Sequence, residues 1–119
     1  MLELHHANTS VCAQKVRLVL AEKELDWTGH VIDIRRGEQF DPAYLKLNSK
    51  AVVPTLIHDG AVIVESSVID EYLDDAFAAP PLKSEDPLAR ARMRLWVKAI
   101  DDGLHAAVVT LSFSIVLRE

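Results

Sequence analysis

The sequence predicts an α/β domain followed by the beginning of an all-helical domain. Three features of the sequence support this fold class. Short β-prone stretches alternate with helical ones over residues 1–79, an Asp59-Gly60 pair separates two such stretches, and residues 87–119 show helical patterns alone. Strands that alternate with helices along a chain are typical of a sheet covered by helices. A chain of 119 residues has room for one small domain and an appendage.

The first strand and the first helix are predicted from alternation and from capping residues. Residues 2–5 alternate between apolar and polar side chains, which is typical of a strand. Residues 8–10, Asn-Thr-Ser, all favour the N-cap position, and a helical pattern follows them to about Lys23. The apolar positions of this helix recur at steps of three and four residues, at Cys12, Val16, Val19 and Leu20.

A second strand and a short helix are predicted next. Residues 27–34 are β-prone and alternate in polarity toward their end, so we expect a strand there. Residues 35–39 are polar and form a loop. The Asp41-Pro42 pair combines an N-cap residue with a proline at the first helical position, and we expect the helix that it begins to end near Leu47.

The stretch 50–66 predicts a β-hairpin. Asp59 and Gly60 stand between two short β-prone runs, and both residues tolerate positive φ angles, so they favour a tight turn. Pro54 is acceptable at the first residue of a strand, where its missing N–H need not interrupt the ladder. Val53 therefore lies at one end of the hairpin, and Glu65-Ser66 follow its second strand at the start of a helix.

A third helix completes the predicted order βαβαββα, which is that of a thioredoxin-like domain. The helix between the first two strands favours a parallel pair, because parallel strands need a crossover connection. The third helix has an apolar stripe at Val68, Ile69, Tyr72, Leu73 and Phe77.

Residues 80–86 form a predicted linker between a domain at 1–79 and a helical segment at 87–119. The linker contains Pro80-Pro81, and Asp86-Pro87 repeats the pattern of a cap followed by proline. A long helix is expected next, with Leu88, Ala91, Leu95, Trp96, Ala99 and Ile100 on one side. Residues 106–117 carry no charge and are too few to span a membrane, which takes about 20 residues, so we expect them to pack against other helices.

The hairpin ends offer a site for a small peptide. A cis Val53–Pro54 bond would turn the backbone of Val53 toward a ligand's peptide group. At the helix start, Ser66 offers a hydroxyl and an N–H to a carboxylate, and Glu65 offers a carboxylate to an ammonium group. Two alternatives stay open at this point. Only about 5–6% of X–Pro bonds are cis, and Ser66 and Ser67 favour the N-cap position in any helix.

Two motifs resemble the N-terminal domain of cytosolic glutathione transferases. One is Val-Val-Pro-Thr-Leu at 52–56, followed by Glu-Ser-Ser-Val-Ile-Asp-Glu-Tyr-Leu at 65–73. The other is Ser-Val-Cys-Ala-Gln-Lys-Val-Arg at 10–17, which is similar to the zeta-class pattern Ser-Ser-Cys-x-x-x-Val-Arg but has Val11 at the second serine. The pattern also lacks the proline that follows the catalytic residue in omega-like members. The resemblance extends over residues 1–85 and more loosely over 86–119.

The resemblance implies the residues that hold glutathione, the cosubstrate of this family. A cis Val53–Pro54 loop pairs with the cysteinyl backbone, while Glu65 and Ser66 hold the γ-glutamyl group. Ser10 matches the residue that activates the thiol. Lys46 and Lys50, shortly before the proline, are candidates for the glycine carboxylate.

An enzyme is therefore expected, which binds glutathione and directs its thiolate at a small electrophile, by conjugation or by isomerisation. Two alternatives remain. One is a non-catalytic binding or regulatory module, and the other is a thiol transferase that uses Cys12. A lone cysteine with apolar neighbours is most often a buried small hydrophobe, so we expect Cys12 to be buried and Ser10 to carry the chemistry.

Composition narrows the remaining possibilities. The net charge of −5 argues against nucleic acid and anionic membranes as partners. A single cysteine excludes an internal disulfide and suits a reducing cytoplasm. The five histidines have no metal-ligand spacing, and His5 and His6 point to opposite faces of one strand. We expect the chain to be a fragment of a homodimeric protein, with the third helix and the helical segment near the dimer contact.

Overall fold

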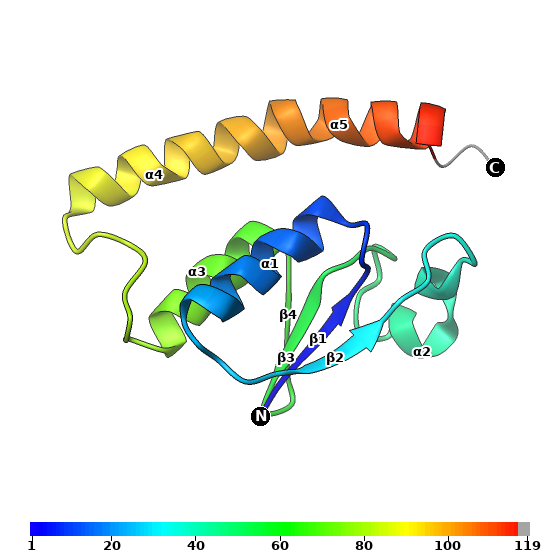
Figure 1. Cartoon of the computed structure of the whole chain (residues 1–119), viewed down its shortest axis with the longest axis horizontal. Helices are drawn as coiled ribbons and strands as arrows, with labels where there is room; N and C mark the ends of the chain where they lie inside the picture. Colours follow the sequence, from blue (N-terminus) through cyan, green and yellow to red (C-terminus); the bar gives the residue numbers. More distant parts are fainter. Residues whose placement is uncertain (117–119) are drawn as a thin grey trace. The chain divides into compact units, whose positions relative to one another are not determined.

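The computed structural model describes residues 1–116 and contains a mixed four-stranded sheet (Figure 1). The strands are β1 (Leu2–His6), β2 (Thr28–Val31), β3 (Thr55–His58) and β4 (Ala61–Val64), and their spatial order is β2-β1-β3-β4. β1 is parallel to β2 and antiparallel to β3, which is antiparallel to β4. The predicted parallel pairing of the first two strands is confirmed.

Helices α1 (Val11–Glu22) and α3 (Ser66–Ala76) pack against each other and bury the apolar face of the sheet (Figure 1). A short helix, α2 (Pro42–Leu45), follows a 3₁₀ turn, η1 (Glu38–Phe40). The thioredoxin-like order βαβαββα is thus confirmed. The core of this layer consists of the fully buried side chains Leu4, Val16, Leu20, Leu56, Ile69 and Leu73.

The hairpin has the predicted bounds and the predicted turn. Asp59 and Gly60 have φ angles of 48° and 86°, which match a turn that needs two positive φ values. Thr55 begins β3 directly after Pro54, and the Val53–Pro54 peptide bond is cis. This is the form that the resemblance implied and that the base rate for proline disfavoured.

Three details of the predicted elements are wrong. The second strand is shorter than 27–34, because the Asp33 carboxylate accepts hydrogen bonds from the N–H groups of Arg35 and Arg36 and turns the chain. Val68 is 55% exposed, since its neighbour Ile69 takes the buried position of the stripe. In α1, Cys12 was expected to be buried but is only half-buried, and its neighbour Ala13 is buried instead.

The chain divides into two compact units, the first being Met1–Leu82. The second contains α4 (Pro87–Ala99) and α5 (His105–Leu111), which continue through π-helical turns at Ile100–Leu104 and Ser112–Val116. The Asp86 carboxylate accepts from the Ala89 N–H at 2.8 Å, so the predicted cap before Pro87 is confirmed. By contrast, the Asp41 side chain makes no capping bond to α2.

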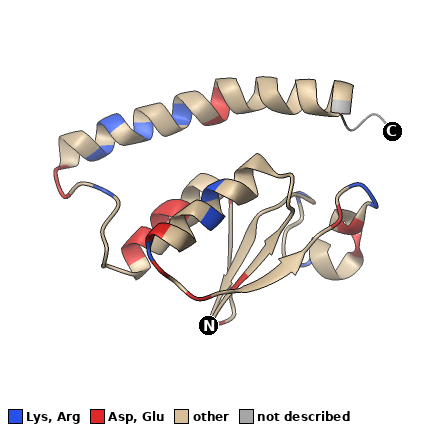
Figure 2. Ribbon diagram, viewed as in Figure 1, with Lys and Arg blue, Asp and Glu red and all other residues tan. Residues whose placement is uncertain are grey.

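The helical segment has no core of its own within the described residues. Neither α4 nor α5 has a buried residue, and α5 is a run without charges (Figure 2). The exposed large apolar side chains of the whole helical segment include Leu95, Trp96, Leu104, Leu111, Phe113 and Ile115. Leu117, the last residue of the predicted uncharged run, lies outside the described residues. Among residues 1–116, no helix is long and apolar enough to cross a membrane.

Candidate functional site

One edge of the sheet gathers the candidate site residues from three separate parts of the chain. In the register of the sheet, His5 pairs with Thr55, and Thr55 pairs with Val64. The end of β1, the start of β3 and the end of β4 therefore lie side by side. Ser10 follows β1, Val53–Pro54 precede β3, and Glu65-Ser66 follow β4, so the structure brings these predicted residues to the same edge.

Ser10 is the N-cap residue of α1. Its backbone is extended, with φ −79° and ψ 118°, and its Oγ accepts a hydrogen bond of 3.2 Å from the Ala13 N–H. A hydroxyl that accepts one hydrogen bond still has its own proton to donate. The capping bond expected of this cluster is present, and it leaves the hydroxyl proton of Ser10 for another acceptor. Cys12, half-buried, lies in the first turn of the same helix.

The N-terminal ends of α1 and α3 meet at this edge. The Lys15 ammonium in α1 donates to the Ser67 hydroxyl in α3 at 2.9 Å. Neither helix has an acidic residue in its first turn. The amino end of a helix is its positive end, and apart from Glu65 at the N-cap position of α3 neither end carries an acidic residue, so both ends favour an anionic group of a ligand.

Glu65 and Ser66 sit at the start of α3 in an arrangement that differs from an ordinary cap. Glu65 occupies the N-cap position with a φ of 72°, and its side chain makes no capping bond. Ser66 is the first residue of the helix and is 9% exposed, so the alternative that Ser66 is the N-cap is wrong. A positive φ at a residue other than glycine costs on the order of 1–3 kcal/mol, and such positions cluster at functional sites.

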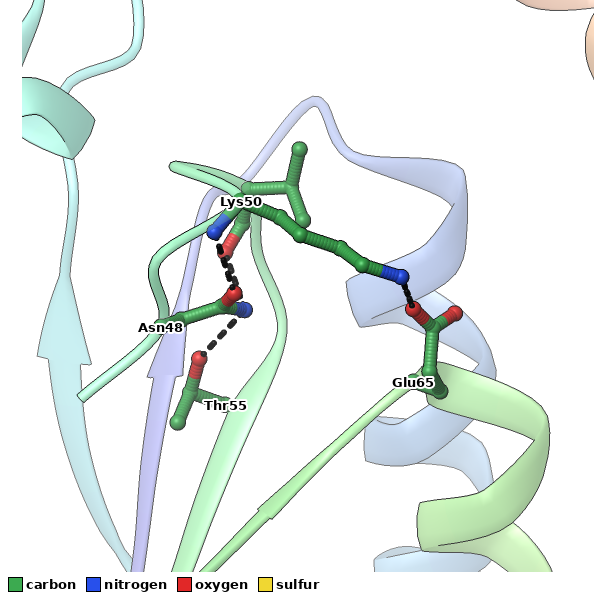
Figure 3. Close-up of polar contacts among 5 residues, drawn as sticks. Asn48, Lys50, Thr55 and Glu65 are labelled. Carbon is green, nitrogen blue, oxygen red and sulfur yellow. Dashed lines mark hydrogen bonds and ion pairs between the residues drawn. The ribbon is translucent and has the colours of Figure 1, made fainter. Parts of the chain in front are cut away.

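Lys50 belongs to the site through Glu65. Its ammonium donates to the Glu65 carboxylate at 2.8 Å, across the space between the proline loop and α3 (Figure 3). The hydrogen bond and the negative charge of Glu65 raise the pKa of Lys50. This contact places Lys50 beside the residue expected to bind an ammonium, and its role toward the glycine carboxylate stays a prediction.

A buried polar network lies directly behind the proline loop, and sequence reasoning missed it. The Tyr44 hydroxyl in α2 lies 2.5 Å from the Val52 carbonyl oxygen and 2.8 Å from Thr55 Oγ1. The Asn48 amide donates to the same two oxygens at 3.1 and 3.2 Å. Burial raises the pKa of Tyr44. The available signal was local: Tyr44 and Asn48 are four residues apart, so they lie on one side of a helical turn.

Arg17 fixes the loop that leads into α1. Its guanidinium donates to His6 Nδ1 at 3.0 Å and to the Ala7 carbonyl at 3.2 Å. Burial, followed by the nearby charge of Arg17, lowers the pKa of His6, which keeps the ring neutral and able to accept this bond. On the opposite face of β1, His5 stacks on His30 with ring centroids 4.7 Å apart, so the predicted opposite orientation of His5 and His6 is confirmed.

Among residues 1–116, no three His, Cys, Asp or Glu side chains come together as candidate metal ligands. The donors and acceptors at this edge are hydroxyls, backbone groups, the ammonium groups of Lys15 and Lys50 and the carboxylate of Glu65. Such a set is chemically suited to an organic ligand that carries both charges and a peptide group. It contains no arrangement typical of a metal centre.

Comparison with known proteins identifies the family of this chain. Residues 9–76 match the family model of the glutathione S-transferase N-terminal domain. The chain belongs to the glutathione S-transferase family. This confirms the resemblance that the motifs at 10–17, 52–56 and 65–73 indicated.

The relatives include proteins with different names. The protein LigF of Sphingobium sp. is 34% identical over 119 residues, which cover 98% of this chain and 46% of LigF. Maleylacetoacetate isomerase of Pseudomonas aeruginosa is 38% identical over 96 residues, covering 78% of this chain and 45% of the isomerase. The chain thus spans about half the length of the curated relatives it matches.

Solved structures agree with the fold. A crystal structure of the β-etherase LigF from Sphingobium sp. strain SYK-6 has a TM-score of 0.91 with 34% identity and covers 97% of this chain and 48% of its own. A glutathione transferase homologue from Sulfitobacter, with bound glutathione, has a TM-score of 0.85 with 27% identity. It matches 90% of this chain and 51% of the homologue.

Proposed function

We propose that this chain supplies the glutathione-binding site of a glutathione transferase, which activates the thiol of glutathione for attack on an electrophile. The observation that carries the proposal is the meeting of Ser10, Val53 and Glu65-Ser66 at one sheet edge, beside two helix N-termini. Glutathione offers an amino-acid head, peptide groups and a thiol, and this edge has a partner for each of them.

Each part of glutathione has an assigned partner in this proposal. Glu65 takes the ammonium of the γ-glutamyl head, and Ser66 takes its carboxylate with the help of the α3 dipole. The backbone N–H and C=O of Val53 pair with the cysteinyl residue, in the manner of a one-residue strand addition. Lys50, which holds the Glu65 carboxylate at 2.8 Å, lies beside this head.

The thiol is activated by Ser10 and by the amino end of α1. A free cysteine thiol has a pKa of about 8.5, and a hydrogen-bond donor together with a helix N-terminus lowers it. The hydroxyl proton of Ser10 is the donor, because the Ser10 oxygen already accepts from Ala13. The resulting thiolate is the nucleophile for conjugation or for isomerisation. Relatives named as an isomerase and a β-etherase support testing both kinds of chemistry.

A second candidate function rests on Cys12. This thiol is half-buried in the first turn of α1, close to the proposed position of the glutathione thiol. In a thiol transferase, the Cys12 thiolate would attack the glutathionyl sulfur of a disulfide substrate, so that a Cys12–glutathione disulfide forms and the other half of the substrate leaves as a thiolate.

Mutation of the complete encoded protein separates the candidates. With Ser10 as the activating residue, Ser10→Ala raises the pKa of bound glutathione and lowers turnover of a generic electrophile, while glutathione affinity changes little. Cys12→Ala leaves conjugation nearly intact. The opposite result, an inactive Cys12→Ala and a silent Ser10→Ala, identifies a thiol transferase. Retention on immobilised glutathione without turnover of any electrophile identifies a binding module.

The assembly and the compartment form part of the same proposal. We infer a cytoplasmic homodimer with a role in detoxification, in which α3 and the helical segment lie near the dimer contact. The exposure of Val68 on α3 and of Trp96 and Phe113 in the helical segment supports a covered surface at these places. Light scattering on the purified complete protein tests the dimer, and a monomer at micromolar concentration contradicts it. Cell fractionation tests the compartment.

A further inference from the structure

We propose that Tyr44 is a positioning residue for ligand recognition. Its hydroxyl and the Asn48 amide bind the carbonyl oxygen of Val52 and thereby fix the Val52–Val53 peptide group, which carries the N–H of Val53. The proposal rests on the proposed function and assigns a role to a residue outside the expected site. Tyr44 is buried in α2 and belongs to neither helix whose N-terminus forms the site.

The buried network has one consistent arrangement of its protons. The Val52 carbonyl has no proton to give, so the Tyr44 hydroxyl donates to it, at 2.5 Å. Thr55 then donates its own proton to the Tyr44 oxygen, at 2.8 Å. The two amide protons of Asn48 go to the Val52 carbonyl and to Thr55 Oγ1.

The remaining acceptor of the Asn48 side chain is also used. Its Oδ1 accepts from the Lys50 N–H at 3.1 Å, so Asn48 links the loop that holds Lys50 to Thr55 (Figure 3). Tyr44 and Asn48 are each 4% exposed, and Thr55 is fully buried. A buried network in which every member is satisfied holds its parts in one orientation.

The direction of the Val52 carbonyl determines the direction of the next N–H. The Val52–Val53 peptide bond is trans, and in a trans peptide the C=O and N–H groups point in opposite directions. Tyr44 and Asn48 bind the Val52 oxygen from the buried side, so the Val53 N–H points away from the interior. Within the described residues, no hydrogen bond of the Val53 N–H is found.

Recognition of a peptide carbonyl follows from this orientation. A loop whose peptide group can rotate loses entropy when a ligand fixes it, whereas a loop already held in place does not. Tyr44 therefore acts through the Val52–Val53 peptide, without touching the ligand, and favours ligands that present a peptide carbonyl to Val53.

The test compares the two tyrosines of the chain. Tyr44→Phe removes the hydroxyl from the network and keeps the ring. Tyr72→Phe is the matched control, because the Tyr72 hydroxyl also makes a side-chain hydrogen bond, with His58 Nδ1 at 2.7 Å, away from the proline loop. Both variants and the wild-type chain are examined by thermal unfolding, by calorimetry with glutathione, and by the line width and chemical shift of the Val53 amide in ¹⁵N NMR spectra.

The expected result separates positioning from stability. Both variants lose some thermal stability, but only Tyr44→Phe broadens or shifts the Val53 amide in the free chain. Only Tyr44→Phe weakens glutathione binding, by roughly 2- to 10-fold, the worth of one hydrogen bond. An unchanged Val53 amide in Tyr44→Phe overturns the proposal, as does equal weakening of glutathione binding by the two variants.

Failure of the proposed function gives a different result. A wild-type chain that does not bind glutathione contradicts the proposed function, while the Val53 amide of the free chain still decides whether Tyr44 holds the peptide. Thr55→Val serves as the second variant if Tyr44→Phe does not fold, since it removes the proton that Thr55 gives to Tyr44. It is expected to perturb the Val53 amide in the same sense, and an unperturbed amide there counts against the network.

Discussion

Two lysine–carboxylate pairs in the first unit have nearly the same length and opposite surroundings. Lys23 and Asp74 lie 2.7 Å apart, with side chains 0% and 6% exposed. Lys50 and Glu65 lie 2.8 Å apart, with side chains 69% and 55% exposed. The same chemical pair thus serves two purposes, and burial distinguishes them. The Lys23–Asp74 pair is buried, whereas the charges of the Lys50–Glu65 pair are accessible to a ligand.

The buried pair closes the C-terminal ends of α1 and α3. Besides Asp74, the Lys23 ammonium binds the Pro80 carbonyl at 2.7 Å, and the Asp74 carboxylate also accepts from the Leu82 N–H at 2.8 Å. Every charged residue of α3 is acidic (Figure 2). Lys23, the C-cap residue of α1, forms an ion pair with one of them, Asp74. These bonds hold the segment that follows α3 against the helices.

The exposed pair lies at the opposite ends of the same two helices, beside the N-termini of α1 and α3. Exposed ion pairs contribute about 0–1 kcal/mol to stability in general, so the Lys50–Glu65 pair is available for exchange with a ligand. The contrast predicts that mutations at the C-terminal ends of α1 and α3 act on stability. Mutations at their N-terminal ends act on binding.

The largest expected effect is at Asp74. Asp74→Ala leaves the Lys23 ammonium buried without its charge partner, which typically costs about 3–5 kcal/mol. Chemical and thermal unfolding of the variant measure this loss. Asp75→Ala, at the neighbouring exposed position, is the control and is expected to change stability little. A loss of stability at Asp74 no larger than that at Asp75 contradicts the structural role of the pair.

The next effect is on binding, at Ser66. Ser66→Ala removes a hydrogen bond to a ligand carboxylate, worth about 1.5–3 kcal/mol, so glutathione affinity is expected to fall on the order of tenfold or more. Isothermal calorimetry gives this value. Ser67→Ala is the matched control, because the Ser67 hydroxyl accepts from Lys15. Unchanged glutathione affinity in a folded Ser66→Ala variant removes Ser66 from the site.

The smallest expected effect is on stability at Lys50. Lys50→Met breaks the exposed pair with Glu65, and since solvent surrounds both groups the thermal midpoint is expected to stay nearly constant. Differential scanning calorimetry of Lys50→Met beside Lys23→Met makes the comparison direct. A loss of stability at Lys50 that matches the loss at Lys23 shows that burial does not distinguish the two pairs.

Local signals in the sequence predicted the fold, and a family resemblance indicated the candidate site residues. The hairpin bounds followed from Asp59-Gly60, and the start of α4 followed from Asp86-Pro87, because each signal depends on neighbouring residues alone. Ser10, Val53 and Glu65 were identified through a family resemblance, and the sheet register brought them to one edge. Their roles in binding stay predictions.

The contacts that the sequence did not predict join distant residues or depend on small rotations. Lys23 and Asp74 are 51 residues apart, and nothing near either residue indicates the other. Tyr44 resembles an ordinary core aromatic until its hydroxyl is seen against Val52 and Thr55. A rotation of about 100° per residue decides that Ile69 is buried and Val68 exposed, a difference that an apolar pattern alone does not resolve.

The central claim is that glutathione binds at the sheet edge where α1 and α3 begin. A titration of the ¹⁵N-labelled chain with glutathione, followed by amide chemical shifts, tests it most directly. The account predicts saturable shifts at Ser10, Val53, Glu65 and Ser66, with Lys23 and Asp74 unaffected. Shifts that centre on the Lys23–Asp74 end of the helices, or no saturable shifts at millimolar glutathione, contradict it.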